Sequence, residues 1–409
     1  MNVVDDDTTR GWSIRFFLLL AAAFTIAVGY GVILPVLPFF LERLTAEGGR
    51  FSVSWHTGML TGVYMFARFV FAPMWGYISD RLGRRPVILL GLAGFSATMV
   101  LFGLAGNLAI AYFARALGGL FSAAVLPVTL AYVGDTNALA QRARGFAWLS
   151  AANAFGSLTG PALAGWLSNA RLPTAIAGNM SPAESFALPF LAAAIMGGIV
   201  WLGIYFLFSK AVPAPRVEDT STSAPSNQAL TGLLILTLLV TFGHGSFMVV
   251  IALLGQQILN LAPSDIGIMF MECSLVMIAV QVLIFLPLVK RLGRHLLAPA
   301  FMAMAVGVGL IPYTANYSVL LVLVGLTAVA SGLLIPALTY LISFAGGLQQ
   351  GVALGRQTSV ASLGQALGSA VAGVLFGLMM PAPFWLTAGL LVISAGIALI
   401  TMSRVLFRG

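Results

Sequence analysis

The sequence carries very little charge: only 8% of its 409 residues are Asp, Glu, Lys or Arg, whereas 60% are hydrophobic. Soluble domains contain about 25% charged and about 45–50% apolar residues. A soluble fold of this length could not hide so much apolar surface from water, so we expect a lipid bilayer to surround the chain. In a bilayer the backbone must satisfy its own hydrogen bonds, which leaves helices or a closed barrel.

Cysteine and histidine are also scarce. The single cysteine, Cys273, excludes an intrachain disulfide and a cysteine-based metal cluster. Three histidines, His56, His244 and His295, fall in separate regions, which argues against a histidine metal centre. The sequence contains no Walker-type loop, no His-Glu-x-x-His pair and no Gly-x-Ser-x-Gly elbow. We therefore predict no enzyme, no catalytic residue, no metal, no cofactor and no ATP coupling.

Long apolar runs, by contrast, are abundant. Runs such as 16–40 and 230–254 exceed the ~20 residues that cross a ~30 Å hydrocarbon core, and they do not alternate as barrel strands do. We predict an all-α membrane protein with two six-helix bundles, at 1–209 and 229–409, joined by a cytoplasmic linker at 210–228. The twelve expected helices are 13–41, 55–79, 86–106, 108–135, 142–169, 184–209, 229–259, 264–289, 296–313, 317–345, 350–379 and 383–405.

The basic residues are divided unequally between the two sets of loops. With a cytoplasmic N-terminus, fifteen of the 20 lysines and arginines fall on cytoplasmic segments, and only Arg43, Arg50 and Arg171 on outer ones. The positive-inside rule then predicts that both termini are cytoplasmic. These loops account for the net charge of +8, so we expect no nucleic-acid partner. We expect a monomeric, multi-pass protein of a bacterial cytoplasmic membrane.

The two halves resemble each other at an offset of roughly 210 residues, as expected for a duplicated transporter. Residues 80–85 (DRLGRR) align with 290–295 (KRLGRH), and the Leu-Pro pair at 126–127 aligns with the Ile-Pro pair at 335–336. Both basic loops then lie on the same membrane face. This symmetry predicts a site for a small-molecule substrate near mid-membrane, between the halves.

Several motifs now support a family resemblance. Residues 76–86 (GYISDRLGRRP) resemble the signature loop between helices two and three of the major facilitator superfamily. Residues 160–165 (GPALAG), preceded by Gly156, resemble the fifth-helix motif of drug:proton antiporters. Residues 29–38 (GYGVILPVLP) resemble the first-helix motif of the twelve-helix branch, which includes tetracycline exporters, and Arg115 with Gly119 matches the fourth-helix motif. The resemblance implies proton-coupled efflux of a small organic molecule by alternating access, with the proton gradient as the energy source.

The signature loop and the fifth-helix motif supply the candidate gating residues. Gly83 allows a tight turn, and Asp80 would pair with Arg84, in a cluster that Asp135 and Arg142 or Arg144 would complete. Such a cluster would stabilise one conformation of the transport cycle and would break in the other. The alternative is an ordinary interfacial ion pair, worth about 0–1 kcal/mol. Gly160 and Pro161 would form a flexing joint, or simply a close-packed helix surface.

Ionisable residues inside a membrane helix are costly and usually functional. Glu272 is the only acid well inside a predicted span, roughly 13 Å past Pro263 at 1.5 Å per residue, and is our candidate for the coupling proton site. A permanent structural salt bridge, to Arg68 or to another helix, is the alternative. His244 would relay protons or act as a neutral hydrogen-bonding group, and Arg115 would assist proton transfer or pair with a carbonyl.

The candidate substrate-binding residues are led by Arg68, which lies near mid-membrane and can bind a carboxylate or phosphate through two hydrogen bonds. No acid lies between Arg15 and Glu42, where many cation exporters carry one, and this favours an anionic or zwitterionic cargo such as a carboxylate metabolite or siderophore. The other polar or aromatic candidates are Tyr30, Tyr64, Asn153, Gln256, Gln257, Gln281, Gln357 and Gln365. Each would bind cargo or join neighbouring helices.

Two other functions remain open for a chain of this type. The same fold would serve a proton symporter or an importer of an organic anion. The other is a channel, although a channel would not need two duplicated halves that rock against each other.

Overall fold

The structure, a computed structural model, describes residues 14–45, 49–136, 139–168, 187–207, 228–282, 296–314, 316–345 and 350–406. Within these ranges the chain forms twelve α-helices and one short 3-10 helix, and no strand. The predicted all-α membrane fold is therefore confirmed. The predicted linker lies outside the described residues, except for Gln228, where a helix begins.

The first six helices form what we call the N-half. They are α1 (Ile14–Leu44), α2 (Gly49–Leu82), α3 (Arg84–Gly103), α4 (Leu108–Thr136), α5 (Leu139–Ser168) and α7 (Leu188–Leu207). α1 packs along α5, and α3 packs against both α4 and α7. Buried Phe40, Phe102 and Phe190 join α1, α3 and α7 through aromatic contacts.

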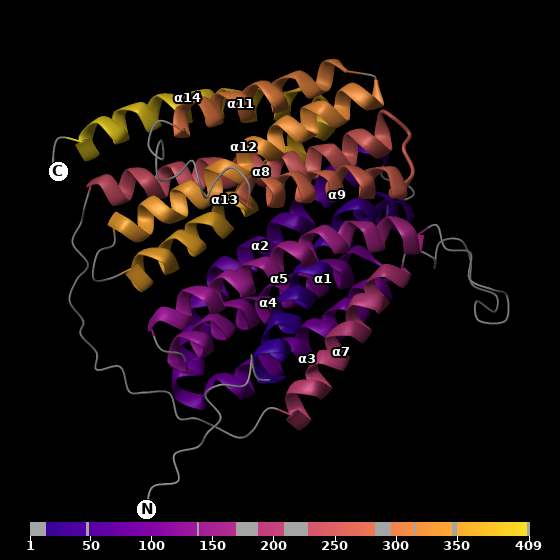
Figure 1. Cartoon of the computed structure of the whole chain (residues 1–409). Coiled ribbons are helices and arrows are strands. Elements are labelled where there is room, and N and C mark those ends of the chain that lie inside the picture. The colour runs from indigo at the N-terminus through magenta and orange to yellow at the C-terminus, as the bar shows by residue number, and fades with distance from the viewer. Residues whose placement is uncertain are drawn as a thin grey trace, which may run out of the picture.

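The remaining helices form the C-half. They are α8 (Gln228–Gln257), α9 (Pro263–Val280), α11 (Leu297–Leu310), the 3-10 helix η3 (Ile311–Tyr313), α12 (Tyr317–Ala345), α13 (Gln350–Leu378) and α14 (Ala382–Leu406). α8 packs against α13 and α14, while α11 packs against α12 and α14. Figure 1 shows the N-half, from indigo to magenta, lying beside the C-half, which runs through orange to yellow.

Most predicted boundaries fall close to the observed ones, and three differences have physical causes. α2 begins at Gly49 rather than 55, because Ser54, which looks like a loop residue, is buried against neighbouring helices. The helix expected at 296–313 ends at Leu310, because Pro312 forces the tighter 3-10 turn. The helix expected at 264–289 is described as α-helical from Pro263 to Val280, and residues beyond 282 lie outside the described part.

Nine of the helices in the described ranges are long and apolar enough to span a membrane. α11 together with η3 is a shorter apolar segment of 17 residues, Leu297–Tyr313. The other two, α2 and α5, have 34 and 30 residues but carry more polar side chains. Both face other helices across the molecule, so part of their surface contacts protein instead of lipid.

The helices alternate in direction, which defines two ends of the molecule. At one end α2 finishes and α3 begins, with Arg81, Arg84 and Arg85; we call this the basic end. At the other, which we call the opposite end, Tyr317 on α12 donates to the backbone of Asp265 on α9, and Trp385 on α14 donates to Tyr313. The first residue of α1 and the last residue of α14 therefore lie at the same end, the basic one, as the sequence predicts.

The two halves meet along two helix pairs, α2 with α13 and α5 with α9. We call these two contacts together the seam. At α2 and α13, a Cβ added to Gly58 would lie 2.7 Å from the Cα of Gly373. At α5 and α9, a Cβ added to Gly165 would lie 2.9 Å from the Cα of Ser264. Gly58, Gly373, Gly165 and Ser264 all belong to the helix segments near the opposite end, so the halves touch most closely there.

Candidate functional site

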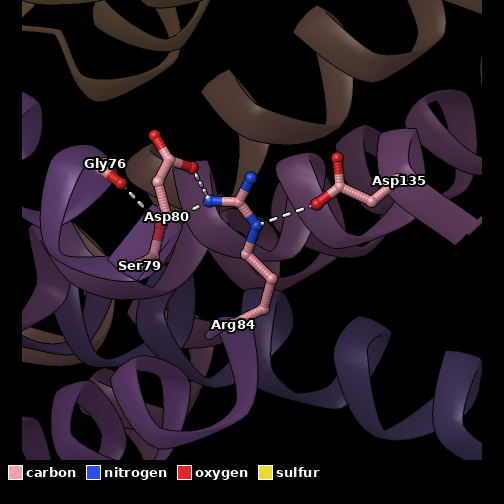
Figure 2. Close-up of polar contacts among 5 residues, drawn as sticks. All are labelled: Gly76, Ser79, Asp80, Arg84 and Asp135. Atoms are coloured by element: carbon pink, nitrogen blue, oxygen red, sulfur yellow. Dashed lines mark hydrogen bonds and ion pairs between the residues drawn. The ribbon is translucent and has the colours of Figure 1, made fainter. Parts of the chain in front are cut away.

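The predicted gating cluster is present at the basic end, as Figure 2 shows. Gly83 separates α2 from α3 with a φ of 91°, a conformation that favours glycine. Arg84 then forms an ion pair with Asp80 at 2.5 Å, and its Nε donates to the Asp135 carboxylate at 2.9 Å. The same Nη1 that pairs with Asp80 also donates to the Ser79 hydroxyl, at 2.6 Å.

This cluster ties together helices of one half. Asp80 lies on α2, Arg84 on α3 and Asp135 on α4, and neighbouring Arg85 donates to the backbone of Tyr205 on α7 at 2.6 Å. Four helices of the N-half are thereby joined near the basic end. Arg144 is exposed on α5, and the side chain of Arg142 lies outside the described part. Latching between conformations stays a prediction.

The fifth-helix motif is a packing surface with two sides. Gly156 and Gly160 face α1, where a Cβ on Gly160 would lie 2.6 Å from the carbonyl oxygen of Val28. Pro161 lies between two helices: its ring meets Gly31 on α1, and its carbonyl meets Gly267 on α9. The motif therefore packs α5 against its own half and against the C-half at once. Whether it flexes stays a prediction.

Near the middle of the membrane-spanning helices, four predicted residues from four helices form one aromatic and polar cluster. The rings of Tyr30 on α1 and Tyr64 on α2 stack with centroids 5.6 Å apart. The Arg115 guanidinium from α4 lies 4.2 Å from the Tyr64 ring centroid, and its Nε donates to the Leu60 carbonyl at 3.3 Å. Gln365 on α13 donates to the Tyr30 hydroxyl at 2.9 Å, which joins the cluster to the C-half.

Arg68 lies one helical turn from Tyr64 on α2 and is half-buried. Its Nη1 lies 4.0 Å from the sulfur of Met65, which is a long contact. The predicted alternative, a salt bridge between Arg68 and Glu272, is not formed among the described residues.

Glu272 instead lies within the C-half, between α9 and α12. A Cβ added to Gly325 on α12 would lie 3.4 Å from one of its carboxylate oxygens. The other oxygen, Oε2, is buried and has no hydrogen-bond partner in the described part of the chain. Next to it, Cys273 is buried and free. Glu272 as a whole is half-buried, so its carboxyl is only partly shielded by the helices around it.

The other predicted residues are spread along the helices. His244 lies in the middle of α8, where its Nδ1 is buried without a partner in the described ranges. Gln256 donates to Glu42 at 2.9 Å, and Gln257 accepts from Ser54 at 3.2 Å, so both join the halves at the opposite end. Gln357 donates to Thr339 at 2.7 Å, within the C-half. Asn153 is half-buried midway along α5, and Gln281 follows the end of α9.

Sequence reasoning missed two features of this region. Gly58, Gly62 and Gly373, which form the α2–α13 contact, were not singled out, although Gly58 and Gly62 have the four-residue spacing of close-packed membrane helices. The sequence marked Glu42 only as the far limit of the stretch without acids that follows Arg15, and no sequence signal reveals its bond to Gln256, 214 residues away.

Comparisons with known proteins agree with this geometry. A sequence profile of the Major Facilitator Superfamily matches residues 19–232 and 233–406. Multidrug resistance protein 2 of Bacillus subtilis (strain 168) is 26% identical over 397 residues, which cover 94% of each chain. The quinolone resistance protein NorA of Staphylococcus aureus (strain COL) is 24% identical over 400 residues, covering 95% of this chain and 96% of its own.

Solved structures show a similar fold. The crystal structure of a D-xylose-proton symporter superposes with a TM-score of 0.74 over 94% of this chain and 97% of its own, at 14% identity. At this identity the likeness concerns the arrangement of the helices alone.

Proposed function

The chain belongs to the Major Facilitator Superfamily, and from this we propose that it exports a small organic molecule in exchange for protons. It is a multi-pass membrane transporter and not an enzyme, as the sequence predicts. Relatives that match nearly its whole length are named for resistance to drugs, which supports outward transport of an organic compound. The proposed orientation places the basic end in the cytoplasm of the cell.

The observation that carries proton coupling is the half-buried carboxyl of Glu272, which lies inside the C-half. Its Oε2 has no partner in the described part of the chain, so no fixed cation holds the group ionised. A carboxyl in such a place binds a proton in one conformation and releases it in the other when its access changes. Helix α9 carries Glu272 and also forms half of the α5–α9 contact, so separation of the halves changes the surroundings of this acid.

The experiment uses the purified full chain in liposomes, with norfloxacin and ethidium as probes. The lumen is made more acidic than the medium, and only molecules whose basic end faces the medium are considered. We then expect the probes to accumulate in the lumen while protons leave it. Glu272→Gln should reduce proton-driven accumulation by about 100-fold, in the range typical for loss of a proton-transfer group. Probe binding should survive, because the substitution keeps the size of the side chain.

Glu42→Gln is the matched control, since it removes the same charge at the exposed opposite end. Proton-driven transport by Glu272→Gln at the wild-type rate would remove Glu272 from the coupling role. Movement of probe and protons in the same direction would replace export by symport. That second function is worth testing because the two arginines near mid-membrane, Arg68 and Arg115, suit an organic anion taken up with protons, and because a symporter shares the fold.

A further inference from the structure

The interior of the N-half has an unbalanced charge. Among its described residues, Arg68 and Arg115 lie well inside the helices, whereas the acids Glu42, Asp80 and Asp135 lie at helix ends. Neither interior arginine forms an ion pair with an acid in the described ranges. A guanidinium that is taken out of water without a counterion is strongly unfavourable, so this region attracts an anion.

Arg115 holds its charge in a fixed place. It is 1% exposed and packs against the rings of Tyr64, at 4.2 Å, and Phe102, at 5.8 Å. Its Nη1 and Nη2 atoms are buried without partners in the described part of the chain, as is the hydroxyl of Tyr64. The aromatic faces stabilise the cation partly, but they leave its hydrogen-bonding capacity unused.

Tyr30 and Arg68 are more accessible to solvent than Tyr64 and Arg115. Both are half-buried, while Tyr64 and Arg115 are fully buried. The Tyr30 oxygen accepts a hydrogen bond from Gln365, so its own proton stays available for donation. Arg68 lies four residues from Tyr64, on the same face of α2, and the Tyr64 ring stacks on the ring of Tyr30. Two donors, one of them cationic, therefore point to the same region.

A polar stripe on α13 leads to this region from the basic end. Gln365, Ser362 and Thr358 are spaced by three and four residues, so they share one face of the helix. Thr358 is exposed and Ser362 partly so, while Gln365 on the same face reaches across to Tyr30 in the other half. This face is therefore turned toward the N-half, and its hydroxyl groups offer a polar path to Tyr30.

We propose that Tyr30 and Arg68 bind the oxyanion group of the transported molecule, a carboxylate-bearing organic anion, between the two halves. Tyr64 and Arg115 are positioning residues, which set the orientation of Tyr30 and add positive charge from behind. This inference rests on the proposed transport function and names the class of its cargo. Gln365 donates to the Tyr30 oxygen while the Tyr30 proton binds the anion, so anion binding affects a contact with the C-half.

The test measures equilibrium binding of three probes with one ring system and different charge to the purified full chain. They are 2-naphthoate, the neutral 2-naphthamide and the cationic 2-naphthylmethylamine. We expect naphthoate to bind about tenfold more tightly than the amide, as a charge-assisted hydrogen bond to a guanidinium would give. Arg68→Ala should abolish this preference, Arg68→Lys should keep part of it, and Tyr30→Phe should weaken naphthoate binding alone.

Two further variants separate a positioning role from a structural one. Arg115→Lys keeps the charge and should retain the naphthoate preference, whereas Arg115→Leu should lose it even where thermal unfolding shows a folded protein. The controls are Arg15→Ala, at the exposed start of α1, and Tyr77→Phe, on the exposed face of α2 near the basic end. Both should leave the preference unchanged.

Equal binding of naphthoate and naphthamide, tighter binding of the amine, binding of none of the three, or a preference that survives Arg68→Ala would each overturn the anion site. Proton-driven export of norfloxacin or ethidium alongside any of these results would leave the proposed function standing. Conversely, naphthoate-selective binding by a chain that couples no protons would support the site and reject proton antiport.

Discussion

The two ends of the helix bundle are held together by different chemistry. At the opposite end, the N-half and the C-half meet through glycines and mostly uncharged hydrogen bonds, for example Gly58 against Gly373 and Ser54 to Gln257. At the basic end, the strongest contacts are ionic and lie within one half, around Arg84. Close packing therefore joins the two halves at the opposite end, whereas ion pairs hold the helices of the N-half together at the basic end.

This difference suggests how the molecule can alternate. Contacts between backbones depend steeply on distance, so the seam is either formed or separated, with few stable intermediates. The basic-end cluster joins α2, α3 and α4, so these helices should move as one body when the seam opens. Charges at a membrane surface are also readily hydrated, so the two halves can separate at the basic end without leaving an ion buried and unpaired.

The largest effect is expected from Gly373→Val, which breaks the seam. The new Cβ would lie 2.5 Å from the Ser54 carbonyl and 2.6 Å from the Gly58 Cα, and neither backbone can yield easily. Overpacking of this kind costs about 1–3 kcal/mol, enough to lower transport by about tenfold or more. The opposite end should open. Maleimide labelling of Ser54→Cys, in a Cys273→Ser background, should therefore become faster.

Gly389→Val is the matched control for this substitution. Gly389 lies on α14, where an added Cβ meets nothing within 4 Å, so transport and labelling should stay near wild type. Unchanged labelling in Gly373→Val, in a protein that still transports normally, would mean that the seam does not control access at this end.

A smaller effect is expected from Asp135→Asn at the basic end. The side chains of Arg84 and Asp135 are 13% and 27% exposed, whereas that of Asp80 is 61% exposed. Double-mutant cycles on transport rate should therefore give a coupling of about 1–2 kcal/mol for Arg84 with Asp135, but only about 0–1 kcal/mol for Arg84 with Asp80. Equal coupling energies would show that solvent exposure does not decide the strengths of the two ion pairs.

The smallest effect is expected from Glu42→Gln at the opposite end. Glu42 accepts a hydrogen bond from Gln256, and a glutamine oxygen accepts it equally well. The transport rate should change by less than about twofold, because a surface pair is worth about 0–1 kcal/mol. The dependence of the rate on external pH should also be unchanged. A large, pH-dependent loss would mean that charge at this end contributes to closure, and would weaken the contrast between the two ends.

The helices were predictable because hydrophobic length and loop charge are local properties of the sequence. The helix at 317–345 begins and ends as predicted, and Pro336 inside it did not mislead, since membrane helices tolerate proline. The start of α2 was missed because Ser54 is polar and yet buried. Local polarity cannot distinguish a side chain facing water from one that faces another half of the same protein.

The gating cluster was predictable in part, and the mid-membrane cluster less so. Asp80 and Arg84 lie on either side of the turn at Gly83, so the sequence already places them close together, and Asp135 was expected to join them from the end of the fourth helix. The bond between Gln365 and Tyr30 joins residues 335 positions apart. The sequence marked both as polar or aromatic groups in apolar helices, but their partnership depends on the angle at which the two halves pack.

Pro161 has a consequence for how the two halves communicate. Its ring presses on α1 at Gly31, next to Tyr30, while its carbonyl presses on α9 at Gly267, five residues from Glu272. A single turn of α5 thus touches both the helix that presents a cargo donor and the helix that carries the protonatable acid. A tilt of either helix displaces its neighbour through this wedge, so the proposed cargo site and the proposed proton site would be coupled through Pro161 without any direct contact between their residues.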